Sequence, residues 1–150
     1  MKAVVQRVLE ASVTIKKETV GQIGPGLLIY LGVQKGDTND DLVWMAEKIL
    51  KLRIFPDSEE KMQYAITDVA GGVLVVSQFT LCADLGKGNR PGFQEAALPA
   101  EAKPVVDAFS TYIAEKGVPV QNGIFGAMMH VSSINDGPVT IILDSRAKLA

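Results

Sequence analysis

The chain of 150 residues contains few of the residues on which most catalytic and metal sites depend. Its only cysteine is Cys82 and its only histidine is His130. A single cysteine excludes an intrachain disulfide and favours a reducing compartment, and no spaced His, Cys and Asp cluster indicates zinc. A lone histidine in a strand pattern is more often structural than catalytic, and Cys82 is typical of a buried, inert thiol. We therefore expect neither a metal nor a cofactor.

Long apolar runs and a strong charge of one sign are also missing. The longest apolar stretch, 27–33, is too short to cross a bilayer, and Gln6 and Arg7 interrupt the N-terminal segment too early for a signal peptide. We therefore expect a cytoplasmic protein without membrane contact. The net charge of −2 argues against broad binding to duplex DNA, which requires many neutralised phosphates, but it leaves room for gripping the end of an RNA.

What remains is the composition of an ordinary globular protein, and its length predicts one domain over residues 1–150. Apolar residues at helical spacing predict two helices, one from a capping box at Thr38–Asp41 to near Pro56 and one from near Pro104 to Gly117. Alternating or continuous apolar runs predict strands at 4–8, 12–15, 27–33, 73–81, 128–133 and 139–143.

The order of these elements predicts the fold class. The helices do not alternate regularly with the strands, so a doubly wound parallel sheet is disfavoured. The sequence favours an α+β fold, with a curved, mostly antiparallel sheet or partial β-barrel that carries two main helices.

Two segments place polar residues where chemistry is possible. Ser77-Gln78-Phe79-Thr80-Leu81 follows an apolar run, as in a strand that reaches a sheet edge or a pocket, although a strand end capped by hydroxyls explains the pattern equally well. Asn135-Asp136-Gly137-Pro138-Val139-Thr140 contains ordinary turn chemistry between two strands. The residues alone leave both a functional and a structural interpretation open.

Together these two segments resemble the two signature motifs of D-aminoacyl-tRNA deacylases. The resemblance covers nearly the whole chain and includes segments 6–8, 24–28, 51–55, 90–91 and 125–129. The chain departs from the family pattern at 63–64, Gly92 and Ser133, outside both motifs. The resemblance implies a homodimeric hydrolase that binds the 3′ end of an aminoacyl-tRNA and cleaves the ester of a D-amino acid.

The resemblance also implies roles for the first motif. Thr80 is the family's candidate nucleophile, but no base stands beside it in the sequence, and an unactivated hydroxyl is a weak nucleophile. We expect instead that backbone N–H groups near Phe79 and Thr80 hold the ester carbonyl oxygen while the neighbouring 2′-hydroxyl of the RNA assists water. The implied substrate-binding residues are Ser77, Gln78, Phe79, Phe125 and Met129.

The second motif is implied to select the D-amino acid. The Gly137–Pro138 bond is expected to be cis and to enter the partner subunit's active site, where its carbonyl oxygens receive the substrate's ammonium and exclude an L side chain. Glycyl-tRNA would then also be cleaved. Arg7 is expected to anchor the subunit interface or to orient this turn. Two alternatives stay open, a hydrolase of another activated ester and a non-catalytic dimeric barrel that binds a ligand.

Overall fold

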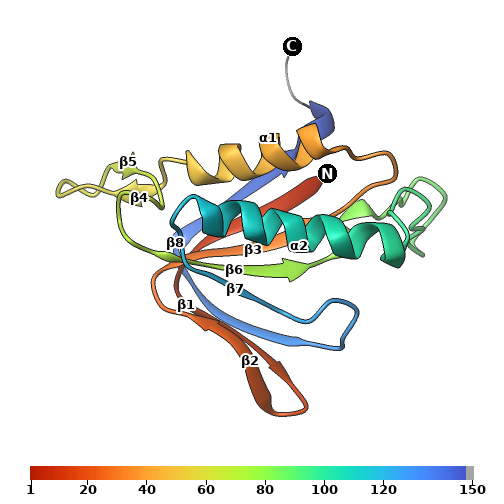
Figure 1. The fold of residues 1–150 in the computed structure, drawn as a ribbon, viewed down its shortest axis with the longest axis horizontal. Helices are drawn as coiled ribbons and strands as arrows, with labels where there is room; N and C mark the ends of the chain where they lie inside the picture. The colour runs from red at the N-terminus through yellow and green to blue at the C-terminus, as the bar shows by residue number, and fades with distance from the viewer. Residues whose placement is uncertain (148–150) are drawn as a thin grey trace.

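Two helices cover one face of a curved mixed sheet in the computed structural model, which describes residues 1–147 (Figure 1). The predicted α+β class, the curved sheet and the two main helices are confirmed. Within these residues, no helix is long and apolar enough to cross a membrane. In chain order the elements are β1 (Lys2–Ile15), β2 (Glu18–Ile23), β3 (Gly26–Gly32), α1 (Asn39–Leu50), β4 (Phe55–Pro56), β5 (Met62–Tyr64), β6 (Gly72–Ser77), the 3-10 turn η1 (Phe79–Cys82), α2 (Pro99–Glu115), β7 (Val120–Asn122), β8 (His130–Asp144) and the 3-10 turn η2 (Ser145–Ala147).

The long strand β1 organises the sheet. Along one edge it pairs with β8, and along the other it pairs first with β3, through residues 2–8, and then with β2, through residues 11–15. These pairings are antiparallel, whereas β3 continues to β6 and β6 to β7 in parallel. Because β1 changes partner along its length, the sheet bends and curls toward a partial barrel (Figure 1).

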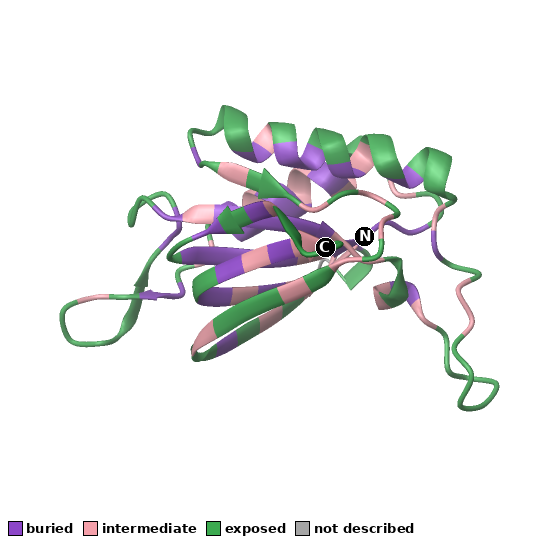
Figure 2. Ribbon diagram, turned by 90° about the horizontal axis from the view of Figure 1, so that it is seen from below, coloured by how far each residue is buried: buried purple, intermediate pink, exposed green. Residues whose placement is uncertain are grey.

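Each face of the sheet has its own hydrophobic core. Successive side chains of a strand point to opposite faces. Leu27, Ile29 and Leu31 of β3 therefore pack in the core that includes both helices, whereas Leu28 packs in the core of the curled half. The apolar run 27–33 is predicted as a buried strand, and burial on both faces explains why it carries no polar alternation (Figure 2).

The first helix begins where the capping box predicts. The Asp41 carboxylate accepts hydrogen bonds from the backbone N–H and the hydroxyl of Thr38, at 2.9 and 3.0 Å. The helix ends at Leu50, earlier than the predicted limit at Pro56. It therefore stops well before the proline, at the point where the chain turns toward β4.

The second helix begins earlier than its predicted start at Pro104. It starts at Pro99, where the Glu101 carboxylate accepts the N–H of Leu98 at 3.4 Å, and Pro104 lies inside it. The prediction was wrong because two prolines compete for the first turn and the capping glutamate belongs to the earlier one. The predicted end is confirmed, since Gly117 follows the helix with a φ of +85°.

The strand boundaries differ from the prediction in how segments join. Segments 4–8 and 12–15 belong to one strand, β1, and segments 128–133 and 139–143 belong largely to β8. The predicted strand 73–81 ends at Ser77, where η1 takes over. The sequence did not predict β2, β4, β5 and β7, of which β5 and β7 are exposed along most of their length.

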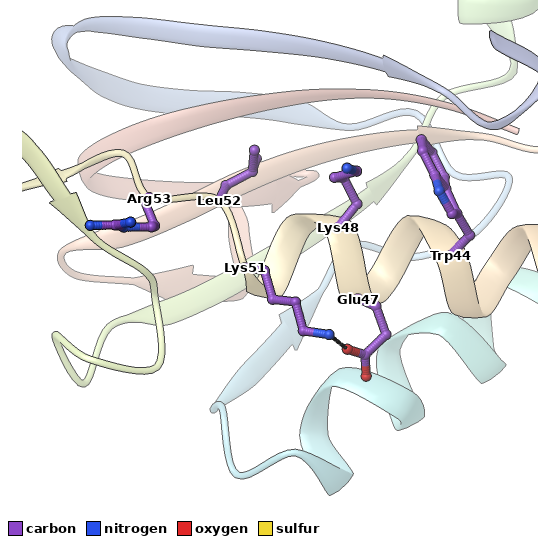
Figure 3. A pocket seen from close by; sticks show the side chains of 6 residues that line it. All are labelled: Trp44, Glu47, Lys48, Lys51, Leu52 and Arg53. Carbon is purple, nitrogen blue, oxygen red and sulfur yellow. Dashed lines mark ion pairs between the residues drawn. The ribbon is translucent and has the colours of Figure 1, made fainter. Parts of the chain in front are cut away.

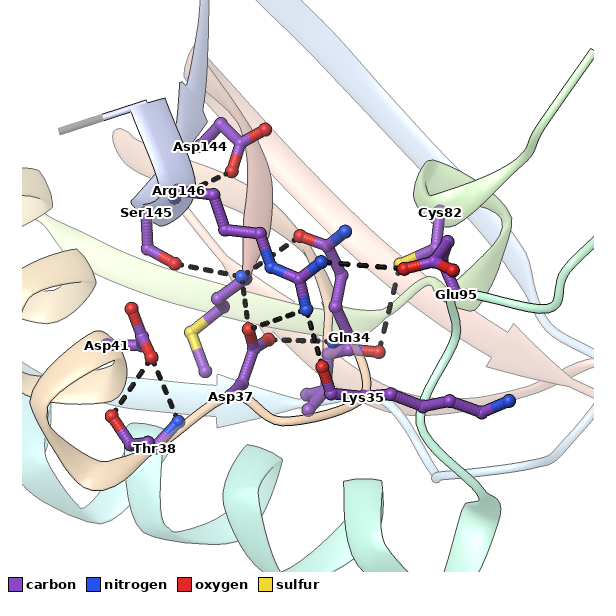
Figure 4. A network of polar contacts seen from close by, with 12 residues as sticks. Gln34, Lys35, Asp37, Thr38, Asp41, Cys82, Glu95, Asp144, Ser145 and Arg146 are labelled. Carbon is purple, nitrogen blue, oxygen red and sulfur yellow. Dashed lines mark hydrogen bonds and ion pairs between the residues drawn. The ribbon is translucent and has the colours of Figure 1, made fainter. Parts of the chain in front are cut away.

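A buried polar network fixes the start of β1 beside η2 (Figure 4). The N-terminal ammonium of Met1 donates to Asp37 at 2.8 Å, to Ser145 at 2.9 Å and to Gln34 at 3.2 Å. The Asp37 side chain is only 2% exposed and also accepts the backbone N–H of Gln34 at 2.7 Å. The network holds the ends of β3 and β8 against β1, close to the thiol of Cys82.

Candidate functional site

The first motif spans the end of β6 and the start of η1. Ser77 pairs with Leu31 of β3, and the Gln78 N–H donates to the Leu31 carbonyl at 2.8 Å. The chain then leaves the sheet, and the Leu81 N–H donates back to the Gln78 carbonyl at 3.3 Å. Because a 3-10 turn replaces the predicted end of the strand, Phe79 and Thr80 are exposed rather than buried in the sheet.

The Thr80 hydroxyl is held by its own motif. It accepts a short hydrogen bond from the side-chain amide of Gln78. An amide N–H donates and takes no proton, so this contact does not activate the hydroxyl as a nucleophile. The backbone N–H groups of Phe79 and Thr80 are the first two of η1, which helical geometry leaves without a partner inside the turn. The motif thus offers two adjacent donors to an incoming oxygen.

Phe79 is paired with a second aromatic residue that the sequence did not predict as part of the site. Its ring meets that of Phe93 edge to face, with centroids 4.9 Å apart and planes at 70°. Phe93 follows a loop whose base is closed by Asp84 and Gly92, which exchange two backbone hydrogen bonds of 2.8 Å. The only sequence signal near Phe93 is the Arg-Pro pair at 90–91, which points to no partner.

The second motif is a bulge within β8. Gln6 pairs with Thr140 and Val8 pairs with Asn135. An advance of two residues along β1 therefore lies opposite an advance of five residues along β8, and the extra residues of β8 form the bulge. The Asn135 side chain closes the base of this bulge, because its Oδ1 accepts the Val139 N–H at 3.0 Å and its Nδ2 lies 3.3 Å from the Val139 carbonyl oxygen. The predicted turn therefore exists, but β1 pairs with the chain on both sides of it.

Arg7 reaches this bulge from β1 of the same chain. Its Nη1 donates to the Ile54 carbonyl at 2.6 Å, and its Nε lies 3.0 Å from the Asp136 carboxylate. The Nε–H does not point along that contact, so the pair is ionic rather than hydrogen-bonded. The Gly137–Pro138 bond is cis, as expected, and Gly137 has a φ of +121°.

Phe125 and Met129 lie in the connection from β7 to β8. The Gly123 N–H donates to the Val75 carbonyl at 2.9 Å, so this connection starts beside β6 and runs in the same direction as β6. Phe125 packs against the core on the helix side of the sheet, and Met129 packs against the other core. The register brings the start of this connection toward the Ser77 end of the sheet, where the first motif begins.

The structure keeps the two motifs apart within one chain. Ser77 of β6 pairs with Leu31 of β3, Leu31 with Ala3 of β1, and Ala3 with Leu143 of β8. Strands β3 and β1 thus separate β6 from β8, and at roughly 4.8 Å per strand spacing this amounts to about 14 Å along the sheet. β6 points to the end where the segment before α2 projects, whereas β8 bends at the opposite end (Figure 1).

A surface hollow of about 540 Å³ lies elsewhere, along the C-terminal half of α1 (Figure 3). Hydrogen bonds from Lys51, Tyr112 and Lys116 lower the pKa of Glu47, in its wall, from 4.5 to about 2. Its lining holds no residue of either motif and consists of Trp44, Glu47, Lys48, Lys51, Leu52 and Arg53. The Glu47 carboxylate links α1 to Tyr112 of α2 and has a structural role.

Cys82 and His130 both lie outside the two motifs. Burial raises the pKa of the Cys82 thiol, which agrees with the expected inert cysteine. His130 is exposed at the start of β8. Among residues 1–147, no group of three or more His, Cys, Asp or Glu side chains is placed to hold a metal ion.

Comparison with known proteins finds relatives over nearly the whole chain. Residues 4–144 match the family described as D-Tyr-tRNA(Tyr) deacylase. Proteins named D-aminoacyl-tRNA deacylase are 57% identical in Chloroflexus aurantiacus, over 97% of this chain and 91% of that protein, and 51% identical in Thermus aquaticus, over 99% and 97%. A solved structure described as c-Myc DNA Unwinding Element Binding Protein has a TM-score of 0.91 and 41% identity, covering 96% of this chain and 98% of that one.

Proposed function

Because the chain belongs to the D-Tyr-tRNA(Tyr) deacylase family, we propose that it hydrolyses the ester between a D-amino acid and the 3′ end of tRNA. The relatives named for this activity match the chain over nearly its whole length. The observation that carries the proposal is the turn at the end of β6. There the chain presents the N–H groups of Phe79 and Thr80 at the surface, beside a hydroxyl already bound by Gln78.

This geometry suits an ester that is already activated. Hydrolysis then needs positioning and stabilisation of the oxygen that becomes negative, more than a strong nucleophile. The N–H groups of Phe79 and Thr80 hold that oxygen, and the 2′-hydroxyl of the terminal ribose assists the attacking water. The Thr80 hydroxyl stays bound to Gln78. Ser77 and Gln78 shape the adenosine end of the site, together with Phe125 and Met129.

The second motif completes the site of a partner subunit. Two strands lie between the Gly137–Pro138 turn and the first motif within one chain, so a second copy must bring the turn to the ester. A twofold homodimer forms both such sites at once. The exposed apolar side chains along β1 and β8 support an interface there, since Ile142 is 77% exposed and Leu9 and Ile134 are about half exposed.

Chirality is then selected by the backbone of the inserted turn. The carbonyl oxygens of Gly137 and Pro138 receive the substrate's ammonium, and an L side chain would point into the same atoms. Arg7 and Asn135 hold the turn from its own chain, which limits its freedom to move aside for an L substrate. A glycyl substrate has no side chain to exclude and is cleaved.

The experiment compares D-Tyr-tRNA, L-Tyr-tRNA, Gly-tRNA and a tRNA-free D-tyrosyl ester. We expect cleavage of the D-tyrosyl and glycyl tRNAs and sparing of the L substrate. Cleavage of the simple ester alone would indicate another ester hydrolase, and cleavage of nothing would indicate a ligand-binding barrel. An active monomer in solution scattering would contradict the composite site.

The role of Thr80 is tested by Thr80→Ala. We expect this variant to keep substantial activity on D-Tyr-tRNA, because loss of a nucleophile lowers the rate by several orders of magnitude and loss of a hydrogen bond does not. Thr111→Ala is a matched control, since Thr111 is exposed on α2, away from the motif. Near-total loss of activity in a folded Thr80→Ala variant would instead indicate that Thr80 is the nucleophile.

A further inference from the structure

The segment between η1 and α2 carries a closed loop that projects beside the first motif (Figure 1). Asp84 and Gly92 clamp its base with two backbone hydrogen bonds of 2.8 Å. Residues 85–91 between them are all exposed. The Asp84 carboxylate accepts the N–H of Gly86 at 2.8 Å, so the acid at the base is engaged with the loop itself. The loop has a fixed base and an exposed tip.

The tip of the loop carries two cationic side chains, those of Lys87 and Arg90. Within residues 1–147, Lys87 and Arg90 form no ion pair and no side-chain hydrogen bond, and both are exposed. Other cations of this chain do pair with carboxylates, among them Lys51, Lys61, Lys103 and Lys116. Two free cations on a projecting loop of a chain with a net charge of −2 indicate a local preference for anions.

The base of the loop is tied to the proposed ester site. Phe93 comes directly after Gly92, and its ring packs against that of Phe79, which is 56% exposed. The loop that carries the two cations is therefore anchored beside an exposed aromatic ring. Proteins bind single-stranded nucleic acid with this combination, in which cations follow the phosphates and aromatic rings stack on bases.

We propose that the loop 85–91 is a phosphate-binding arm for the single-stranded 3′ end of tRNA, with Lys87 and Arg90 as its ligands. This inference rests on the proposed function, which places the ester of the terminal adenosine at Phe79 and Thr80. The phosphates that precede that nucleoside then pass the loop. Two cations supply too little charge for a long duplex, so the arm contacts only the end of the RNA.

The salt dependence of binding measures these contacts. Each phosphate neutralised on a single strand contributes about 0.7 to the slope of log K against log salt, so two contacts contribute about 1.4. Between roughly 50 and 200 mM salt, the affinity of a variant without both cations should therefore fall about sevenfold less than that of wild type. The loss should appear in KM for D-Tyr-tRNA and spare kcat.

The experiment uses the full-length double variant Lys87→Gln/Arg90→Gln, with Lys61→Gln/Lys103→Gln as a control of equal charge change. D-tyrosyl-adenosine, which lacks phosphates, is the second substrate. We expect the loop variant to raise KM for D-Tyr-tRNA and to flatten its salt slope, while KM for D-tyrosyl-adenosine stays near that of wild type. Urea unfolding confirms that both variants are folded.

Several results of these measurements would overturn the inference. Among them are a salt slope equal to that of wild type, an equal loss on the phosphate-free substrate, and the same effect in the control variant. Binding of an RNA oligonucleotide ending in CCA separates this inference from the proposed function. One outcome is that wild type cleaves neither substrate and still binds the oligonucleotide with a salt slope that the loop variant lacks. That result would support the phosphate-binding arm and contradict the proposed hydrolase. Tighter binding to duplex DNA of equal length would contradict the assignment to single-stranded RNA.

Discussion

The contact between Arg7 and Asp136 should be measurable as a coupling energy between β1 and the bulge of β8. The Arg7 side chain is 10% exposed and that of Asp136 is 37% exposed, with Nε and Oδ2 3.0 Å apart. Asp136→Asn removes the counter-ion of a nearly buried guanidinium. Arg7→Met removes the cation and also leaves the buried carbonyl of Ile54 without its donor.

The burial of the two partners sets the magnitude. Breaking a fully buried pair costs about 3–5 kcal/mol, and an exposed pair contributes about 0–1 kcal/mol. Because Asp136 is more than a third exposed, we expect a cost of about 1–2 kcal/mol for Asp136→Asn, between these limits. Arg7→Met should cost about 1–3 kcal/mol more, because a buried carbonyl loses its hydrogen bond.

A double-mutant cycle in urea unfolding tests this reasoning. The double variant should be less destabilised than the sum of the single variants by about 1–2 kcal/mol, because the pair can be lost only once. Independent sites add within about 0.3–0.5 kcal/mol. Additivity within that range would refute the view that Arg7 holds the bulge through Asp136, and Arg7 would then act through Ile54 alone.

Three further predictions concern the bulge, the N-terminal network and the α1–α2 link. Gly137→Ala should lower the free energy of unfolding by about 2–4 kcal/mol, because its φ is +121° and a Cβ would lie 2.8 Å from Val139, whereas Gly24→Ala, at an open position, should be nearly neutral in the same assay. Asp37→Asn should cost about 3–5 kcal/mol in urea unfolding, because the Met1 ammonium is buried, and a change under about 1 kcal/mol would contradict this. The pKa of Glu47 is lowered in the fold from 4.5 to about 2, so its contribution to stability is complete above pH 4.5 and is lost as the pH falls toward 2. Acid unfolding of wild type and Glu47→Gln should therefore converge toward pH 2, and a constant difference would contradict the assignment.

The fold was predictable where the signals are local. The capping box at Thr38 and the glycine at 117 locate two helix ends from a few neighbouring residues. The start of α2 was not, because Pro99 and Pro104 give the same signal and Glu101 decides between them. Strand β2 was not predictable because its outer positions are polar, and only pairing with β1 makes it a strand.

The site shows the same division between local and distant information. The sequence located both motifs and the cis bond through their resemblance to a family. It did not indicate that Asn135 closes the bulge, that Asp136 pairs with Arg7, or that Phe93 packs on Phe79. Each of these contacts depends on a strand register or on the path of a loop, and the neighbouring residues in the sequence determine neither.

In the proposed dimer, the bulge of β8 enters the site of a partner subunit, and its contacts within its own chain bear on that role. A turn that must exclude an L side chain in another chain cannot be shaped by the pocket it enters, so it has to be rigid beforehand. Asn135 bridges its base, Val139 anchors its far side in the core and Gly137 supplies a φ that other residues resist. Arg7, on the neighbouring strand, fixes it from the side. The contacts of the motif thus come from β8 itself and from Arg7 of β1, which the Ile54 carbonyl holds in turn. If the proposed dimer is correct, substitutions in the motif should alter the selectivity of the partner's site before they alter the pocket of their own chain.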